Sequence, residues 1–312
     1  MAGSDKVKNI RIAAIIAVVG NMVLSVLKIV AGTASGSGAL ISDGIDSLTD
    51  VLISMVSLVV ARVILKPADV EHPWGHGRAE TVATVFLSFI IFLAGAQIII
   101  SSVSNLIAGT QKLTSSTIAV VVTLISIAGK MLLAFSQYAL GKRANSAMVK
   151  ANAKNMASDV LVSLGVLVGL GISALTGAAY ADAVIAILIG LWVIKTAIGV
   201  FLEANLELMD GNRDMEPYYI IMDAVDAVAG ASNPHRARIR RIAGLWDIDF
   251  DIDVDPKSTV LEAHGIALQV EQKIKENLEN VYDIMIHIEP RGDDSPEVFG
   301  LSAKEMPTEK TK

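Results

Sequence analysis

Six long apolar segments dominate this 312-residue sequence and leave few folds open to it. A helix that crosses a membrane needs about 20 mostly apolar residues. Six stretches meet this requirement, at 10–31, 38–65, 80–107, 115–141, 146–176 and 180–203. Hydrophobic residues make up 53% of the chain, which is more than a soluble domain normally carries. We therefore predict an α-helical membrane protein whose six transmembrane helices run antiparallel in succession, because their connections are short.

The positive charges indicate which side of the membrane each connection faces. Lysine and arginine are enriched in cytoplasmic connections. On one side of the predicted spans lie Lys6, Lys8, Arg11, Lys66, Arg78, Lys142 and Arg143. Only Lys112 lies in the opposite connections. We expect a multi-pass protein of the plasma (inner) membrane with both termini in the cytoplasm, and a first helix that is retained because no small-residue cleavage site follows it.

After residue 209 the pattern changes to charged segments with helical and strand periods. We predict helix 215–228, strand 236–242, strand 247–254, helix 258–278 and strand 282–289. This order, αββαβ, predicts a small cytoplasmic α+β domain. The expected organisation is therefore a transmembrane domain at 1–209, a cytoplasmic domain at 210–290 and a polar, disordered tail at 291–312.

Two pairs of polar residues lie inside apolar segments. Asp46 and Asp50 are four residues apart, and Asn155 and Asp159 have the same spacing. Residues at this spacing share one helix face. A charged side chain at the bilayer centre costs about 2.5–3.5 kcal/mol and usually lines a pathway or a polar interior. The pairs indicate a path for a cation; the alternative is hydrogen bonding between helices. Three lysines within or near apolar segments could extend toward an interface and are assigned no role: Lys28, Lys130 and Lys195.

Composition narrows the chemistry of any ligand. The chain has no cysteine, so it has neither disulfides nor thiolate ligands, and hard or borderline cations are favoured over Cu(I). The formal net charge of −6 provides no basic surplus for nucleic acid, and we expect no nucleic-acid partner.

The histidines lie outside the apolar segments. Asp69, His72 and His76 form a D-x-x-H-x-x-x-H pattern that could bind a divalent ion; the alternative is a solvated loop with His76 near a helix start. In the soluble domain, strand pairing could gather several scattered residues, or the histidines could be ordinary surface residues. These candidates are His235, Asp251, His264, His287 and Glu289.

With these motifs the chain resembles the cation diffusion facilitators over nearly all of its length. Members of this family have six membrane helices, a cytoplasmic αββαβ domain and the D-x-x-x-D pair found here as Asp46 and Asp50. They also have the loop motif matched here by Asp69, His72 and His76. Zinc-exporting members carry H-x-x-x-D in the fifth helix, whereas this chain has asparagine at position 155. The resemblance implies a transport site at Asp46, Asp50, Asn155 and Asp159.

The resemblance also implies a loop site at Asp69, His72 and His76, and a cytoplasmic metal site. By alignment the cytoplasmic site comprises His235, Asp251, His264, His287 and Glu289, with Asp251 standing where zinc-type members have histidine. Members of the family form homodimers through the cytoplasmic domain, with a salt bridge near the membrane that corresponds here to Arg78 and Asp210.

The membrane ligands then suggest a metal and a mechanism. Without an imidazole the site has only oxygen donors, which suit Mn²⁺ and, less well, Fe²⁺ better than Zn²⁺. Loss of the metal would leave several negative charges together, so we expect protons carried by Asp46, Asp50 and Asp159 to replace it. The expected function is proton-coupled efflux of divalent metal, not enzymatic catalysis, with no cofactor beyond the metal ions and with lipid around the helices. The alternatives are a metal-sensing membrane scaffold and a divalent cation channel.

Overall fold

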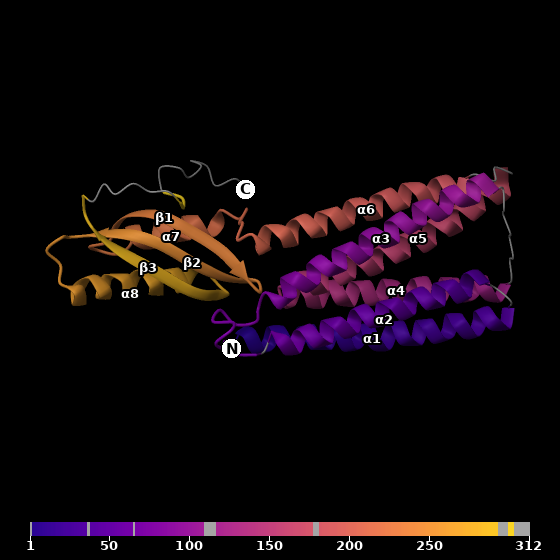
Figure 1. The fold of residues 1–312 in the computed structure, drawn as a ribbon, viewed down its shortest axis with the longest axis horizontal. Coiled ribbons are helices and arrows are strands. Elements are labelled where there is room, and N and C mark those ends of the chain that lie inside the picture. The colour runs from indigo at the N-terminus through magenta and orange to yellow at the C-terminus, as the bar shows by residue number, and fades with distance from the viewer. Residues whose placement is uncertain are drawn as a thin grey trace. The chain divides into compact units, whose positions relative to one another are not determined.

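The structure is a computed structural model that describes residues 2–35, 38–64, 66–108, 117–176, 181–292 and 299–302. It divides into two compact units, Met1–Asn205 and Leu206–Lys312. The first contains long helices, and the second contains a three-stranded sheet with two helices (Figure 1). The predicted fold class, a helical membrane domain followed by a small αββαβ domain, is confirmed.

Six long helices form the first unit. Their bounds are α1 Ala2–Ser35, α2 Gly38–Val63, α3 Ala79–Ala108, α4 Thr117–Arg143, α5 Ala147–Thr176 and α6 Ala181–Leu208. Among the described residues, α1, α2, α3, α4 and α6 are long and apolar enough to cross a membrane. The fifth helix, α5, is 30 residues long. Several helices extend past the apolar stretches expected from sequence, because helical hydrogen bonding continues into the polar flanks.

Polar contacts fix how these helices run. In Figure 1, α1 packs along α2 and α4, and α5 packs along α4 and α3. Gln137 near the end of α4 donates a hydrogen bond of 2.8 Å to the carbonyl of Ala13 near the start of α1. The buried Lys6 and Glu80, near the starts of α1 and α3, form an ion pair of 2.6 Å. Helices α1 and α3 therefore begin on the same side of the unit, and α4 runs the opposite way.

Helices α3 and α6 approach closely at two glycines. A Cβ atom added at Gly95 would lie 3.1 Å from the Gly190 carbonyl oxygen, and one added at Gly190 would lie 3.1 Å from that of Gly95. Small residues allow such backbone contact, which replaces the hydrophobic effect as a source of packing energy between helices in lipid. Large apolar side chains point outward elsewhere, including Val23, Phe86 and Leu132. Their exposure is expected of surfaces that face lipid.

The second unit is built on one mixed sheet. Strand β1 (Ser232–Ile242) pairs antiparallel with β2 (Leu245–Val254), and β2 pairs parallel with β3 (Val281–Pro290). The turn between β1 and β2 uses Ala243 and Gly244, both at positive φ, 53° and 74°, as a tight hairpin requires. Strand β1 also has register shifts on both sides of His235. These bulges change which residues of β1 lie opposite β2.

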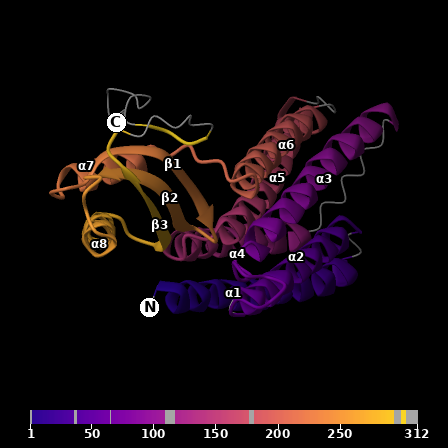
Figure 2. The same cartoon turned by 60° about the vertical axis from the view of Figure 1, so that its left-hand side comes forward.

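Two helices cover one face of this sheet, as Figure 2 shows. Helix α7 spans Glu216–Asp226, and α8 spans Val260–Asn277. Thr259 and Glu262 form a capping box that satisfies the free amide groups at the start of α8. The apolar residues of β2 alternate with its aspartates, so Ile248, Phe250 and Ile252 enter the core. The aspartates of β2 consequently lie on the opposite face of the sheet.

The predicted disordered tail falls mostly on 293–298 and 303–312, which lie outside the described residues. Within the described part of the tail, Leu301 forms an isolated bridge with Ala237 of β1 through two hydrogen bonds of 2.9 Å.

Candidate functional site

The interior of the membrane unit is polar along α1, α2, α4 and α5. Residues three, four or seven apart share a helix face, and each of these helices turns such a polar face inward. The buried polar side chains include Asn21, Ser25, Lys28, Ser47, Asp50, Ser54, Ser126, Lys130, Gln137, Asn152 and Asn155. The unit thus combines an apolar exterior with a polar interior, which is typical of proteins that pass charged substrates.

Two carboxylates and an amide meet in this interior. The Lys130 ammonium of α4 lies 2.8 Å from Asp50 Oδ2 of α2 and 2.5 Å from Asp159 Oδ2 of α5. Asn155 of α5 donates its amide hydrogen to the other oxygen of Asp50, Oδ1, at 3.0 Å. Three of the four expected membrane ligands therefore lie around one point, with oxygen atoms contributed by two helices. We call Asp50, Asn155, Asp159 and Lys130 the central cluster.

The fourth expected ligand, Asp46, lies one helical turn before Asp50 on α2. Its side chain is exposed, and it interacts with Asp50 and Lys130 electrostatically, without a hydrogen bond or ion pair among the described contacts. Its role as a ligand stays a prediction.

Lys28 and Lys130 do not extend toward an interface, although their positions in the sequence allowed it. Lys28 is 1% exposed and Lys130 is 4% exposed. The Lys28 ammonium lies 2.8 Å from Asp43 Oδ2 and donates to Ser47 Oγ at 3.0 Å. Buried charges need partners, and the acidic residues of α2 provide them within the helix interface. Lys195 has an exposed side chain on α6.

The loop after α2 gathers its three candidate ligands. Asp69 Oδ1 accepts a hydrogen bond of 2.7 Å from the backbone amide of His72 and lies 3.1 Å from His72 Nδ1. Asp69 Oδ2 lies 3.4 Å from His76 Nε2. The amide of His72, followed by its ring, lowers the pKa of the Asp69 carboxyl from its ordinary value of 3.8. One ligand atom from each residue lies within 4.8 Å of the others, so this loop could hold one ion.

In the soluble unit, the histidine of β1 meets acidic residues of β2 and β3. His235 Nε2 lies 3.2 Å from Glu289 Oε2, while Nδ1 of the same ring contacts the Asn233 carbonyl at 2.7 Å. Ligand atoms of His235, Asp253 and Glu289 lie within 4.8 Å of one another. Asp253 was not among the residues expected from sequence. The alternation of β2 places it on the same face as Asp251, and the sequence did not distinguish the two.

Asp251, which was expected in this cytoplasmic cluster, pairs with an arginine. Arg236 Nη1 lies 2.7 Å from Asp251 Oδ2 and 4.0 Å from Glu289 Oε1. Asp251 is 2% exposed, so the guanidinium neutralises a buried carboxylate. Similar pairs follow along the two strands, with Arg240 and Asp247 joined at 2.7 Å. The acidic face of β2 is thus largely balanced by arginines of β1.

The remaining expected ligands lie at or beyond the edge of this cluster. His287 Nε2 is 3.5 Å from Glu289 Oε1, with a side chain that is 63% exposed. His264 is exposed on α8, and no contact among the described residues joins it to the cluster. Asp210 lies 3.5 Å from Arg240 in its own unit. The implied pair between Asp210 and Arg78 joins the two units and stays a prediction.

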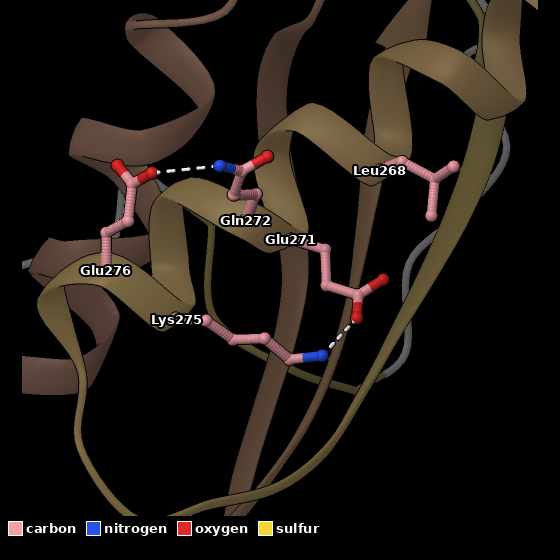
Figure 3. Close-up of a pocket in the computed structure, with 5 residues that line it drawn as sticks. All are labelled: Leu268, Glu271, Gln272, Lys275 and Glu276. Carbon is pink, nitrogen blue, oxygen red and sulfur yellow. Dashed lines mark hydrogen bonds and ion pairs between the residues drawn. The ribbon is translucent and has the colours of Figure 1, made fainter.

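A surface hollow on α8 is lined by Leu268, Glu271, Gln272, Lys275 and Glu276 (Figure 3). Its charged residues pair along the helix: Lys275 contacts Glu271, and Gln272 donates to Glu276 at 3.1 Å. These are exposed pairs within one helix, and we assign no ligand to the hollow.

Comparison with known proteins agrees with these observations. Residues 14–209 match the profile of the cation efflux transmembrane domain, and residues 214–291 match the cytoplasmic domain of cation efflux proteins, which indicates dimerisation. The two matches together cover most of the chain, including the central cluster and the acidic sheet face.

Three curated proteins are similar over nearly the whole length. The uncharacterized transporter YdbO of Bacillus subtilis is 33% identical over 93% of this chain and 99% of its own. The manganese efflux system protein MneS of Bacillus subtilis is 30% identical over 92% of this chain and 97% of its own. The cation-efflux pump FieF of Pectobacterium atrosepticum is 31% identical over 90% of this chain and 93% of its own. The chain therefore belongs to the cation diffusion facilitators, the family of cation efflux proteins, and is a multi-pass membrane protein.

Proposed function

We propose that this protein exports Mn²⁺ from the cell in exchange for protons, with Fe²⁺ and then Zn²⁺ as poorer substrates. The observation that carries the proposal is the meeting of Asp50, Asn155 and Asp159 in the polar interior of the membrane unit. The donor atoms there are carboxylate oxygens and an amide. Oxygen donors suit Mn²⁺, whereas Zn²⁺ prefers sites that include nitrogen or sulfur.

The printed name of one relative supports the same metal. MneS is called a manganese efflux system protein, and it resembles this chain along nearly its full length. The name of FieF specifies only a cation-efflux pump. The substrate is therefore proposed from the ligand chemistry first and from this similarity second.

Proton exchange is proposed from the charge of the site. When they are ionised, Asp46, Asp50 and Asp159 together carry three negative charges, and Lys130 would offset one of them. Departure of a divalent cation leaves an excess of negative charge in a low-dielectric interior, which protons can neutralise. Metal and protons would then occupy the site in turn as helix groups rock between two orientations.

Regulatory metal ions of the same class would bind at two further places. One is the loop with Asp69, His72 and His76, and the other is the group of His235, Asp253 and Glu289 in the cytoplasmic domain. We propose a homodimer in the plasma membrane with both termini in the cytoplasm and no cofactor beyond metal ions. The homodimer would associate through the cytoplasmic domain, the part of the chain that matches the dimerising profile.

Transport into proteoliposomes tests the proposal. The vesicles carry an inward metal gradient and an opposing pH gradient, and uptake of Mn²⁺, Fe²⁺ and Zn²⁺ is compared. We expect Mn²⁺ uptake to be fastest and to move protons outward in proportion to metal. Flux without proton movement would favour the channel, and binding without flux would favour the scaffold.

A further inference from the structure

The central cluster contains a positive charge that its expected role as a metal site does not explain. Lys130 projects from α4, which contributes no expected ligand, and its ammonium contacts one oxygen of each acidic residue. Its side chain is 5% exposed, as against 7% for Asp50 and 32% for Asp159. The ammonium therefore lies between the oxygen atoms that would bind a metal.

We propose that Lys130 is a built-in competitor for the transported metal: its ammonium occupies the ligand oxygens of Asp50 and Asp159 and must leave them when a divalent cation binds. This inference rests on the proposed function of the central cluster. Lys130, which lies outside the ligand motifs of α2 and α5, would then set the metal affinity of the site.

The geometry does not allow the Lys130 ammonium and a divalent metal ion to occupy the site at the same time. Oxygen ligands surround divalent ions such as Ca²⁺ and Mg²⁺ at about 2.0–2.6 Å. Oδ2 of Asp50 and Oδ2 of Asp159 already lie 2.8 Å and 2.5 Å from the ammonium nitrogen. A metal bound between these oxygens would stand almost where the nitrogen stands. The nitrogen and the metal are both positively charged, so they would also repel each other strongly in a buried site.

The side chain of lysine suits this role. It is a point charge on a flexible stem of four carbons, so it can withdraw from the oxygens while its backbone stays in α4. The neighbouring Asn155 holds the second oxygen of Asp50 at 3.0 Å, which keeps the carboxylate oriented while its partner changes. A metal-free site would thus remain assembled.

The consequence is weaker metal binding than the oxygen ligands alone would give. When the binding-competent form is only a fraction of the population, the apparent dissociation constant rises by the inverse of that fraction. An exporter gains from this, because a substrate that binds too tightly is released slowly. Return of the ammonium to the oxygens would assist release of the metal.

Metal binding to the purified full-length protein tests the proposal at one fixed pH. Lys130→Met and Lys130→Gln remove the charge, and Lys130→Arg keeps it. Titration with Mn²⁺ alone should give a dissociation constant at least about tenfold lower for both neutral variants than for wild type. The arginine variant should stay within about threefold of wild type, because its guanidinium is always charged.

Lys28→Met is the matched control. Lys28 is similarly buried, but its ammonium contacts Asp43, outside the central cluster, and acts on Asp159 only at longer range. Its dissociation constant should change by less than about threefold, since its ammonium does not contact the ligand oxygens. A purely structural role for Lys130 predicts unchanged or weaker binding in the neutral variants.

Two outcomes separate this inference from the proposed function. If folded Lys130→Met and Lys130→Gln bind Mn²⁺ no more tightly than wild type while Asp159→Asn abolishes binding and transport, the competitor role is overturned and the site assignment stands. If Asp159→Asn binds and transports Mn²⁺ normally, the site assignment fails, and the competitor role fails with it. Size-exclusion chromatography identifies the folded variants. If Lys130→Met does not fold, Lys130→Gln serves as the neutral variant, because its amide can still form hydrogen bonds.

Discussion

Replacing Asn155 with histidine tests whether one side chain carries the metal preference. Asn155 is 5% exposed and holds Asp50 through its amide nitrogen at 3.0 Å. In Asn155→His the imidazole has two nitrogens, so one can contact Asp50 while the other faces the metal. The central cluster would then resemble the H-x-x-x-D arrangement of zinc-exporting relatives.

The expected magnitude follows from what the substitution changes for each metal. Loss or distortion of the bond to Asp50 weakens the site for every cation, so that cost cancels in the ratio of two metals. The exchange of an oxygen ligand for a nitrogen ligand does not cancel, because imidazole favours Zn²⁺. We expect the ratio of Zn²⁺ to Mn²⁺ transport to rise at least about tenfold, equivalent to about 1.4 kcal/mol.

The assay compares wild type and variant in proteoliposomes at matched protein density, with each metal supplied alone over a range of pH. Histidine has an unperturbed pKa of about 6.5, and only its neutral form binds metal, so zinc transport by the variant should fall on acidification through the range where it titrates. A variant that still transports, with an unchanged metal ratio and an unchanged pH profile, would refute Asn155 as a ligand. It would also remove the main physical support for manganese.

Three further predictions concern other parts of the chain. Asp159→Ala should reduce metal transport to background while the protein remains folded and membrane-inserted, because the substitution removes both a ligand and a proton acceptor. Metal flux measures the transport, and size-exclusion chromatography checks the folding. Near-normal flux would contradict the prediction. The pKa of the Asp69 carboxyl is lowered from 3.8, so its hydrogen bond to the His72 amide should persist as pH falls to 3.8 and be lost only as pH falls through the lower pKa of the folded state. Hydrogen exchange of the His72 amide, measured against pH, follows this bond. Loss of the bond above pH 3.8 would contradict the prediction. Gly190→Leu should destabilise the membrane unit by about 1–3 kcal/mol through overpacking against α3. A Cβ atom added at Gly199 on the same helix would meet nothing within 4 Å, so Gly199→Leu should have less effect. Thermal unfolding in detergent compares the two variants, and equal losses would oppose the packing argument.

Much of the fold could be predicted from the sequence because its periodic patterns are strong. The apolar segments are long enough to admit only membrane helices, and the DIDFDIDV alternation of β2 predicts a strand with one buried face. Element boundaries were less predictable. Strand β1 begins at Ser232, ahead of the expected 236, because bulges around His235 let the chain remain paired through an irregular stretch. Bulges leave no clear signature in a single sequence.

The candidate sites show where reasoning from sequence stops. The four-residue spacing of Asn155 and Asp159 was enough to predict that they share one face of α5. Their approach to Asp50 required only that α2 and α5 pack together. Lys130 was missed because the long, flexible side chain of a lysine in an apolar segment was taken to be able to reach an interface. Only the packing of α4 against its neighbours shows that this side chain turns inward. Asp253 was missed for a similar reason, since strand register decides which aspartate faces Glu289.

The ion pairs between helices also constrain the order in which the chain can settle into a bilayer. An unpaired charge at the centre of a spanning helix costs about 2.5–3.5 kcal/mol. The α1–α2 hairpin neutralises Lys28 internally through Asp43, but Asp50 has no basic partner in it among the described contacts. That carboxylate gains its basic partner only when Lys130 arrives with α4, some 80 residues later in synthesis. Until the fourth helix joins it, we therefore expect the newly made hairpin either to hold Asp50 protonated or to keep its inner face near water or an insertion factor.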